Sequence, residues 1–166
     1  MTGGGTAGNG ADSVLIREAT TADIDGLAAS NAALFAADAA ARDPLRNPDW
    51  PRSHAAEHVA GTLADPAMLV LAAEAGRDIV GHLTGVLLPG SVMWTVPRAE
   101  LFSMHVMAPW RGQGIGSRLV DRFRDWAESR GAAQLRVSAY TANEGALRFY
   151  RRHGFCPLDT TLTLDI

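Results

Sequence analysis

The pattern of apolar residues predicts one α/β domain built around a mixed, mostly antiparallel sheet. The chain has 166 residues, of which 47% are hydrophobic and 20% charged, and this composition is that of one domain with a single core. Segments that alternate every second residue are interleaved with segments of helical periodicity, in the order β-α-α-β-β-β-α-β-α-β. A glycine-rich hexapeptide also stands where a strand passes into a helix. We therefore expect a twisted sheet of six to seven strands flanked by about four helices.

The N-terminal part is expected to form one strand and two helices. Alternation over residues 13–18 predicts the first strand. Thr21 or Asp23 then caps a helix that runs through an alanine-rich stretch. Three prolines between residues 42 and 51 predict a loop, after which Ser53 caps the second helix.

The middle of the chain predicts three strands. Residues 68–74 and 79–88 are apolar runs on either side of a short turn, which is typical of a hairpin. Residues 89–97 form a second expected loop. The strand over residues 99–107 then leads directly into the glycine-rich hexapeptide.

The C-terminal part predicts a helix, a short strand over residues 134–138, another helix and a last strand. Asn143 suits the N-cap of the second of these helices, and Gly154 suits the position after its end. Threonine and aspartate alternate with leucine and isoleucine over residues 160–166, which predicts the final strand.

Composition excludes several classes of protein. The formal net charge is −3 and the chain has no basic stripe, so we expect no nucleic-acid partner. An apolar run of 18 residues is missing, so we expect no membrane span. Cys156 is the single cysteine and cannot form an intramolecular disulfide. Residues 1–12 resemble neither a signal peptide nor an anchor; we expect a disordered tail before a domain at residues 13–166, and a cytoplasmic location.

The hexapeptide at residues 111–116 has the composition of an anion-binding loop. Its glycines leave the backbone open, and free N–H groups at a helix start attract an anion. Arg111 adds a fork of donors suited to phosphate. A P-loop would need a Gly-Lys pair, and the chain has no lysine; a dinucleotide-binding fingerprint would need glycine where Ser117 stands. The pattern therefore predicts a pyrophosphate site of a different kind.

A second motif lies downstream of the first. R-x-x-G-x-G at residues 111–116 is followed by N-x-x-A-x-x-x-Y-x-x-x-G-F at residues 143–155, with a helix and a strand between them. In both motifs the chain resembles the GNAT (GCN5-related) N-acetyltransferase superfamily, and residues 14–24 resemble the first strand and helix of that family. The resemblance implies a single-domain GNAT-like fold, an acetyl group transferred from acetyl-CoA to a primary amine in a ternary complex, and a homodimer.

The resemblance also implies a role for individual residues. Tyr150 would protonate the departing CoA thiolate, and Asn143 would bind the pantetheine arm. The other expected cofactor contacts are Met104, His105 and Val106 on the preceding strand, and Arg111, Gly112, Gln113, Gly114, Ile115, Gly116 and Ser117 around the pyrophosphate.

Glu100 is the candidate general base. On a strand without a bulge, Glu100 shares a face with Phe102, Met104 and Val106, so its carboxylate would lie along the pantetheine groove. A β-bulge would reverse this parity. A water molecule and His82 are the alternative bases.

Other functions are compatible with parts of the sequence. A CoA-binding module without transferase activity would keep the glycine-rich loop. His54 and His58 share a helix face in an H-x-x-E-H pattern, but a third zinc ligand is missing, so we expect no metal. Trp50 and Trp94 lie in the two loops expected to contact the acceptor, which we expect to be a small-molecule amine of undetermined identity.

Overall fold

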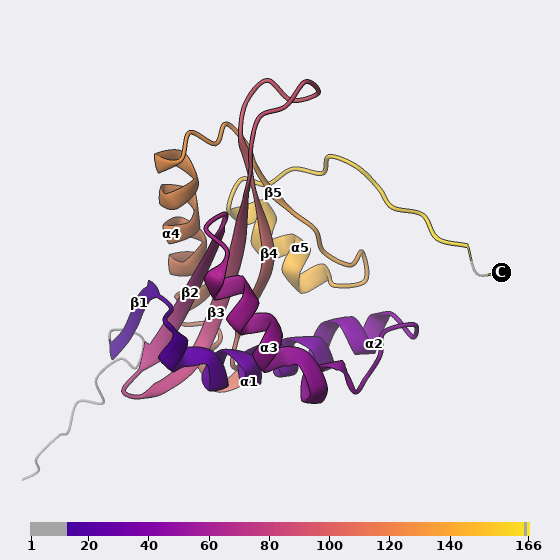
Figure 1. The fold of residues 1–166 in the computed structure, drawn as a ribbon. Coiled ribbons are helices and arrows are strands. Elements are labelled where there is room, and N and C mark those ends of the chain that lie inside the picture. Colours follow the sequence, from indigo (N-terminus) through magenta and orange to yellow (C-terminus); the bar gives the residue numbers. More distant parts are fainter. Residues whose placement is uncertain (1–12, 165) are drawn as a thin grey trace, which may run out of the picture.

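The computed structural model describes residues 13–164 and 166, and it contains a five-stranded sheet (Figure 1). The strand order is β1-β2-β3-β4-β5; the first three junctions are antiparallel, and β4 pairs with β5 in parallel. This is the mixed, mostly antiparallel α/β sheet expected from the sequence. The expected tail at residues 1–12 lies outside the described residues. The strands are β1 (Val14–Glu18), β2 (Met68–Ala75), β3 (Asp78–Leu88), β4 (Arg98–Val106) and β5 (Leu135–Val137).

Helices cover both faces of this sheet. Apolar side chains of α4 enter one large core cluster with the strands, and side chains of α5 pack against the same cluster. A second, smaller cluster joins α1, α3 and the opposite face of β2. The sheet is therefore the middle layer, with α4 on one side and α1 and α3 on the other (Figure 1). The helices are α1 (Ile24–Leu34), α2 (Ala40–Arg42), α3 (Trp50–Ala64), α4 (Ile115–Ser129) and α5 (Glu144–Arg152).

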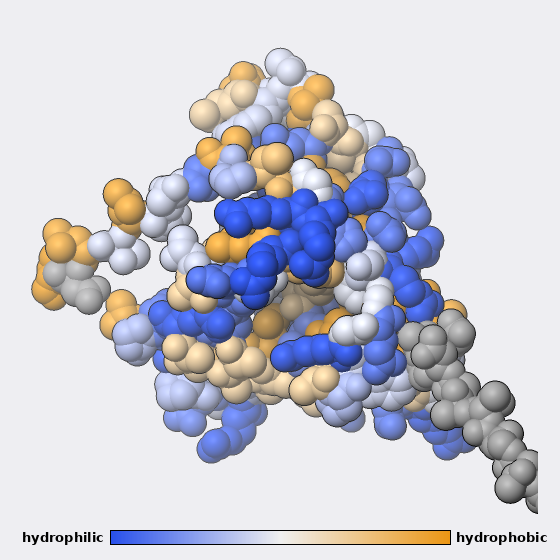
Figure 2. Space-filling model, turned by 180° about the vertical axis from the view of Figure 1, so that it is seen from behind, coloured by the Kyte–Doolittle hydropathy of each residue, from blue (hydrophilic) through white to orange (hydrophobic). Residues whose placement is uncertain are grey.

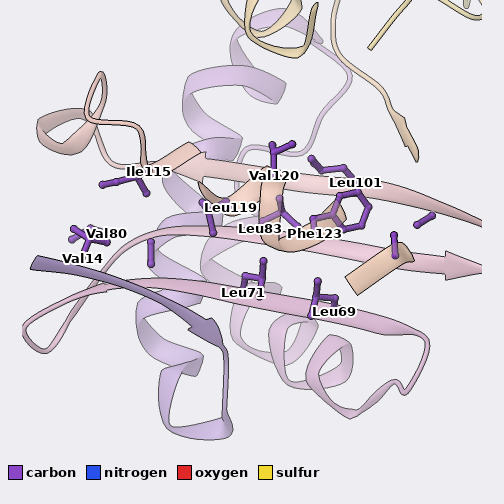
Figure 3. Packing of buried hydrophobic residues seen from close by; sticks show 13 residues of the cluster. Val14, Leu69, Leu71, Val80, Leu83, Leu101, Ile115, Leu119, Val120 and Phe123 are labelled. Atoms are coloured by element: carbon purple, nitrogen blue, oxygen red, sulfur yellow. The ribbon is translucent and has the colours of Figure 1, made fainter. Parts of the chain in front are cut away.

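The core beneath α4 follows directly from its apolar stripe. Leu119, Val120 and Phe123 recur at helical spacing and are fully buried against the strands (Figure 3). Gly85 of β3 lies under this helix, where an added Cβ would collide with the Phe123 ring. Glycine at this position thus allows the helix to close onto the sheet.

The start of α1 agrees with the expectation, and the start of α3 differs from it. A 3-10 turn (Thr21–Asp23) precedes α1, and the Asp23 carboxylate accepts the Thr20 N–H at 2.7 Å. Asp23, one of the two expected caps, is the N-cap of α1. Helix α3 begins at Trp50 instead of after Ser53, because proline is tolerated in the first turn of a helix, where its missing N–H would have no partner.

Between α1 and α2 the helix widens into a π-helical turn at Phe35–Ala39. Such turns are rare, occur mostly as single bulges, and gather at functional sites. The sequence predicted an uninterrupted helix here, because an alanine-rich stretch carries no signal for the extra residue per turn.

A β-bulge interrupts β4. Thr84 of β3 lies opposite Ser103, and Gly85 lies opposite Leu101, so Phe102 has no partner. An extra residue shifts the alternation of side chains by one, and the faces before and after it are exchanged.

The bulge makes one sequence expectation wrong. Ala99 and Leu101 belong to the core beneath α4, and Met104 and Val106, beyond the bulge, pack against the same core. Glu100 lies between Ala99 and Leu101 and therefore faces the other side of the sheet. Glu100 does not share a face with Met104 and Val106, because parity holds only along an uninterrupted strand.

The last predicted strand is also wrong, and the sheet has five strands instead of six to seven. The described residues after α5, 153–164 and 166, contain no strand, and the segment leads away from the body of the molecule (Figures 1 and 2). Leu162 and Leu164 are 89% and 87% exposed. Alternation makes a segment suitable for a strand, but the strand forms only where a neighbouring edge accepts its hydrogen bonds. Within the described part of the chain, no helix is both long and apolar enough to cross a membrane.

Candidate active site

The glycine-rich loop joins β4 to α4 through a 3-10 turn (Ala108–Trp110). Gly112 and Gly114 have φ angles of 75° and 80°, a left-handed conformation that costs other residues free energy. A Cβ added at either position would meet nothing within 4 Å, so the space beside the loop is open. Within the described residues, the backbone N–H groups of residues 112–117 donate to no backbone carbonyl. The loop thus presents a row of unpaired donors at a helix N-terminus, which suits an anion.

Side chains of the loop hold it in place. The Gln113 amide donates to the Pro109 carbonyl at 3.1 Å, and the Ser117 hydroxyl lies 3.1 Å from Nε2 of His153, the C-cap of α5. Gly116 lies against the Phe149 ring, which a Cβ would approach to 3.4 Å. Gln113 and Ser117 therefore brace the loop with their side chains, while their backbone N–H groups stay available.

Arg111 turns back toward β4. Its Nε donates to the Val106 carbonyl at 2.8 Å, and one terminal nitrogen lies 3.1 Å from His105 Nε2. The sequence placed this guanidinium at the anion. In the structure the guanidinium lies at the base of the loop, and one of its two terminal nitrogens is within hydrogen-bond distance of His105.

The edge of β4 that faces β5 is open over half its length. Pairing with β5 is confined to Ala99, Glu100 and Leu101. From Phe102 to Val106, the structure gives β4 no strand partner on that side within the described residues. An extended ligand lying there would meet backbone groups of the edge that pair with no strand, as an added strand would; the Val106 carbonyl already accepts from Arg111.

Asn143 caps α5, as predicted. Its Oδ1 accepts the Ala146 N–H at 3.1 Å, and its Nδ2 donates to Asp38 Oδ1 at 2.8 Å. Asp38 also forms an ion pair with Arg42 at 2.7 Å. Asp38 comes from the π-helical turn, so the sequence gave no reason to place it beside α5.

Tyr150 lies in an aromatic setting on α5. Its ring makes edge contacts with Phe149 and Phe155, with centroids 5.3 and 5.6 Å apart. Burial, with the Asp38 carboxylate as a second cause, raises the pKa of the Tyr150 phenol to about 12. The phenol therefore carries its proton throughout the physiological range, which a general acid requires.

The two candidate bases lie on the other face of the sheet. Glu100 is partly buried and makes no hydrogen bond or ion pair within the described residues. His82 is fully buried, with Nδ1 2.7 Å from the Ser30 hydroxyl. Burial and the neighbouring His105 lower the pKa of His82 to about 3. His82 therefore cannot meet a substrate directly.

His105 was expected among the cofactor contacts; its side chain is buried on the face of the sheet that α1 covers. It is 7% exposed and lies 3.2 Å from the Ser30 hydroxyl on α1. Burial, and secondarily the Arg111 charge, lowers its pKa. The backbone of His105 lies on the open edge of β4, so only its backbone atoms are placed to contact a cofactor there.

The other sequence candidates have local packing partners. Trp50 stacks on Phe35 at 5.9 Å and meets the His58 ring edge-on at 5.4 Å. Trp94 lies under the Arg98 guanidinium at 4.0 Å. Among the described residues, no three His, Cys, Asp or Glu side chains come together as a metal site.

The comparisons with known proteins identify the family. Residues 35–155 match the model of the acetyltransferase (GNAT) family. The chain belongs to this family.

Individual relatives are more distant. N-alpha-acetyltransferase 30 of Schizosaccharomyces pombe is 34% identical over 62 residues, which are 37% of this chain and 41% of that protein. The chain spans only 25% to 45% of the length of the first curated relatives that it matches.

Solved structures match over nearly the whole chain. A transcriptional regulator from Bacillus halodurans C-125 has a TM-score of 0.74 and 28% identity, covering 92% of this chain and 99% of its own. The aminoglycoside N-acetyltransferase AAC(6')-Iy in complex with CoA has a TM-score of 0.74 and 14% identity, covering 92% and 94%. At that identity the second likeness concerns the fold alone.

Proposed function

We propose that this protein is an N-acetyltransferase that moves an acetyl group from acetyl-CoA to a primary amine by direct attack in a ternary complex. The observation that carries the proposal is the row of unpaired N–H groups at residues 112–117, which follows the open edge of β4 in the chain after one 3-10 turn. An anion followed by an extended amide chain fits this arrangement, and CoA has that form. Membership of the acetyltransferase family supports the same reading.

Each part of acetyl-CoA has a corresponding group in the chain. The pyrophosphate lies on the backbone of Gly112 to Ser117, which has open space beside it. The pantetheine arm lies along Met104 to Val106 and takes backbone hydrogen bonds there. Asn143 contributes from the start of α5, through atoms not used for its cap, once its amide leaves Asp38.

The chemical step needs orientation, a place for the oxyanion and a proton for the thiolate. Holding the amine and the thioester in line can supply several kcal/mol, on the order of 7 or more in favourable cases. A backbone N–H near Val106 stabilises the oxyanion. Tyr150 protonates the departing thiolate.

The raised pKa of Tyr150 bears on this last transfer. A thiolate with a reference pKa of about 8.5 is a weak base beside a phenol at about 12. The burial that raises the pKa of the phenol also raises that of a thiol held in the same apolar setting. The difference between the two pKa values is therefore smaller when the proton is transferred. Tyr150 and Asn143 belong to the same helix, since Asn143 is the N-cap of α5 and Tyr150 lies within it.

The test is release of free CoA from acetyl-CoA across a panel of primary amines, with Tyr150→Phe beside the wild type. We expect the variant to keep its affinity for CoA and to lose about 10²-fold or more in rate. Tyr140→Phe is the matched control, because the Tyr140 hydroxyl is buried without a hydrogen-bond partner within the described residues. Its rate should equal that of the wild type; an unchanged rate in Tyr150→Phe would remove Tyr150 from the acid role.

The alternative function, a CoA-binding module without transferase activity, gives a different result. It binds acetyl-CoA tightly and releases no CoA with any amine, and Tyr150→Phe changes nothing. Absence of binding would overturn both functions together. A homodimer, a cytoplasmic location and a small-molecule acceptor stay predictions, and the panel of amines addresses the last of these.

A further inference from the structure

A continuous series of hydrogen-bonded polar groups runs between the sheet and α1 and ends at the glycine-rich loop; its three middle groups, His82, Ser30 and His105, are buried. Ser103 Oγ lies 3.2 Å from His82 Nε2, and His82 Nδ1 lies 2.7 Å from Ser30 Oγ. The same Ser30 hydroxyl lies 3.2 Å from His105 Nδ1, and His105 Nε2 lies 3.1 Å from an Arg111 terminal nitrogen. Two strands, one helix and one loop thus supply five groups in series.

The chemistry of arginine determines the direction of every hydrogen bond in this relay. A guanidinium can only donate, so His105 Nε2 accepts from Arg111. A neutral His105 must then carry its proton on Nδ1 and donate to Ser30. Ser30 in turn donates to His82 Nδ1, so His82 carries its proton on Nε2.

The hydrogen bond at the Ser103 end of the relay therefore has His82 as donor and Ser103 as acceptor. His82 Nε2–H donates to Ser103 Oγ, which leaves the Ser103 hydroxyl to donate beyond the relay. Both imidazoles stay neutral at physiological pH, because burial lowers the pKa of each. The relay responds to its surroundings by exchanging tautomers, without gaining charge.

We propose that Arg111 sets the direction of the Ser103–His82–Ser30–His105 relay, and that the relay reverses when Arg111 leaves His105 for an anion on the glycine-rich loop. This rests on the proposed function only in taking CoA as that anion. In the reversed relay, His105 carries its proton on Nε2, Ser30 donates to His105, His82 donates to Ser30, and Ser103 donates to His82 Nε2. His82 thereby becomes a proton acceptor at the end of the relay beside the bulge.

The reversed relay can take up one proton. A proton that reaches the Ser103 oxygen, released by an attacking amine, displaces the Ser103 proton to His82 Nε2. The Nδ1 proton of His82 passes to Ser30, the Ser30 proton passes to His105 Nδ1, and the Nε2 proton of His105 leaves to water. One proton enters, one leaves, and the relay returns to the direction that Arg111 imposes. Ser103 and His82 are thus positioning residues for removal of the amine proton.

The test is the tautomeric state of each histidine, read from long-range proton–nitrogen correlations in the full chain labelled with ¹⁵N-histidine. In the free protein we expect the proton of His105 on Nδ1 and that of His82 on Nε2. Arg111→Leu should reverse both tautomers, and Arg111→Lys, which restores a donor-only group, should keep the wild-type pattern. The opposite tautomers in the free wild type, or unchanged tautomers in Arg111→Leu, would overturn the proposal.

Two further variants separate the relay from a general effect on packing. Ser30→Ala removes the middle of the relay, so His105 should keep its proton on Nδ1 while His82 loses its fixed tautomer. Gln113→Ala removes another side-chain bond of the same loop and should leave both histidines unchanged. Equal changes at His82 and His105 in Ser30→Ala would show that the tautomers do not follow from the series of bonds.

Added CoA tests the physiological trigger. The expected result is the reversal seen in Arg111→Leu; saturating CoA with unchanged tautomers would overturn the trigger. If CoA does not bind, the proposed function fails, whereas the Arg111 variants still decide the direction of the relay. For the proton path, Ser103→Ala should lower kcat/KM about tenfold or more and Ser103→Thr should restore it; equal rates in the two variants would exclude Ser103.

Discussion

The two faces of the sheet are built on different principles. Beneath α4, the contacts are apolar and regular, and Leu119, Val120 and Phe123 enter the core from one helix stripe. Beneath α1, the buried layer includes Ser30 and His82, which are fully enclosed and joined by a hydrogen bond. The first face gains stability from close packing and needs no particular partner for each group. On the second face every polar group needs its own partner, because an unpaired buried group is costly.

The largest effect expected from this comparison is on the α4 face. Phe123→Ala removes a fully buried ring and should lower the free energy of unfolding by about 3–5 kcal/mol. Phe102→Ala is the matched control, because the Phe102 side chain is 62% exposed at the bulge, and it should change stability by less than about 0.5 kcal/mol. Urea unfolding of both variants measures the difference. Equal losses would mean that Phe102 is buried by a partner in solution.

The polar face should make stability depend on pH. The folded pKa of His82, at about 3, lies below the ordinary value of 6.5, so below pH 6.5 the unfolded chain binds a proton that the folded chain refuses. This contribution is complete above pH 6.5 and is lost as pH falls toward 3, by up to about 1.4 kcal/mol per pH unit. His105 adds in the same direction. Urea unfolding between pH 7 and 5 measures the slope.

The control for this slope is a variant without the titrating ring. His82→Asn should be less stable at pH 7 and should show a flatter dependence between pH 7 and 5. Asp23, whose pKa lies at about 2 because Arg17 donates to it, loses its contribution only at lower pH. If the free energy of unfolding of the variant depends on pH as steeply as that of the wild type, His82 is not the source of the slope.

The smallest effect on stability is expected in the glycine-rich loop. Gly114→Ala places a Cβ on a residue with φ of 80° and should cost about 1–2 kcal/mol. Gly131→Ala is matched, because Gly131 has φ of 76° and open space around it in a turn away from the loop. Both variants should lose similar stability, and only Gly114→Ala should lose CoA affinity in a calorimetric titration. If the two variants bind CoA with equal affinity, the glycine-rich loop does not bind CoA.

Much of the architecture could be predicted from the sequence. The hairpin of β2 and β3, the amphipathic α4 and the cap of α5 by Asn143 all follow from local patterns, and the structure confirms them. The two motifs predicted the family, which the family model confirms. Each of these features depends on residues within about one helix or hairpin of one another, and the physical preferences involved act over that distance.

The features that the sequence did not reveal depend on distant partners. The bulge at Phe102 exists because β4 pairs with β3 in a register that has one residue too many, and it alone places Glu100 on the other face. Asp38 reaches Asn143 through a π-helical turn in an alanine-rich helix. The strand expected over residues 160–166 has suitable alternation, but its described residues lie on no sheet edge.

The sequence by itself determined the family, the α/β order as far as α5 and the glycine-rich loop, because each is encoded by neighbouring residues and by backbone conformations that only glycine adopts readily. Only the tertiary structure decided which groups meet across the sheet. It turned Arg111 toward His105 and joined two histidines through Ser30, residues that are far apart in the chain. Hydrogen-bond direction depends on which donor reaches which acceptor, and no local pattern carries that information.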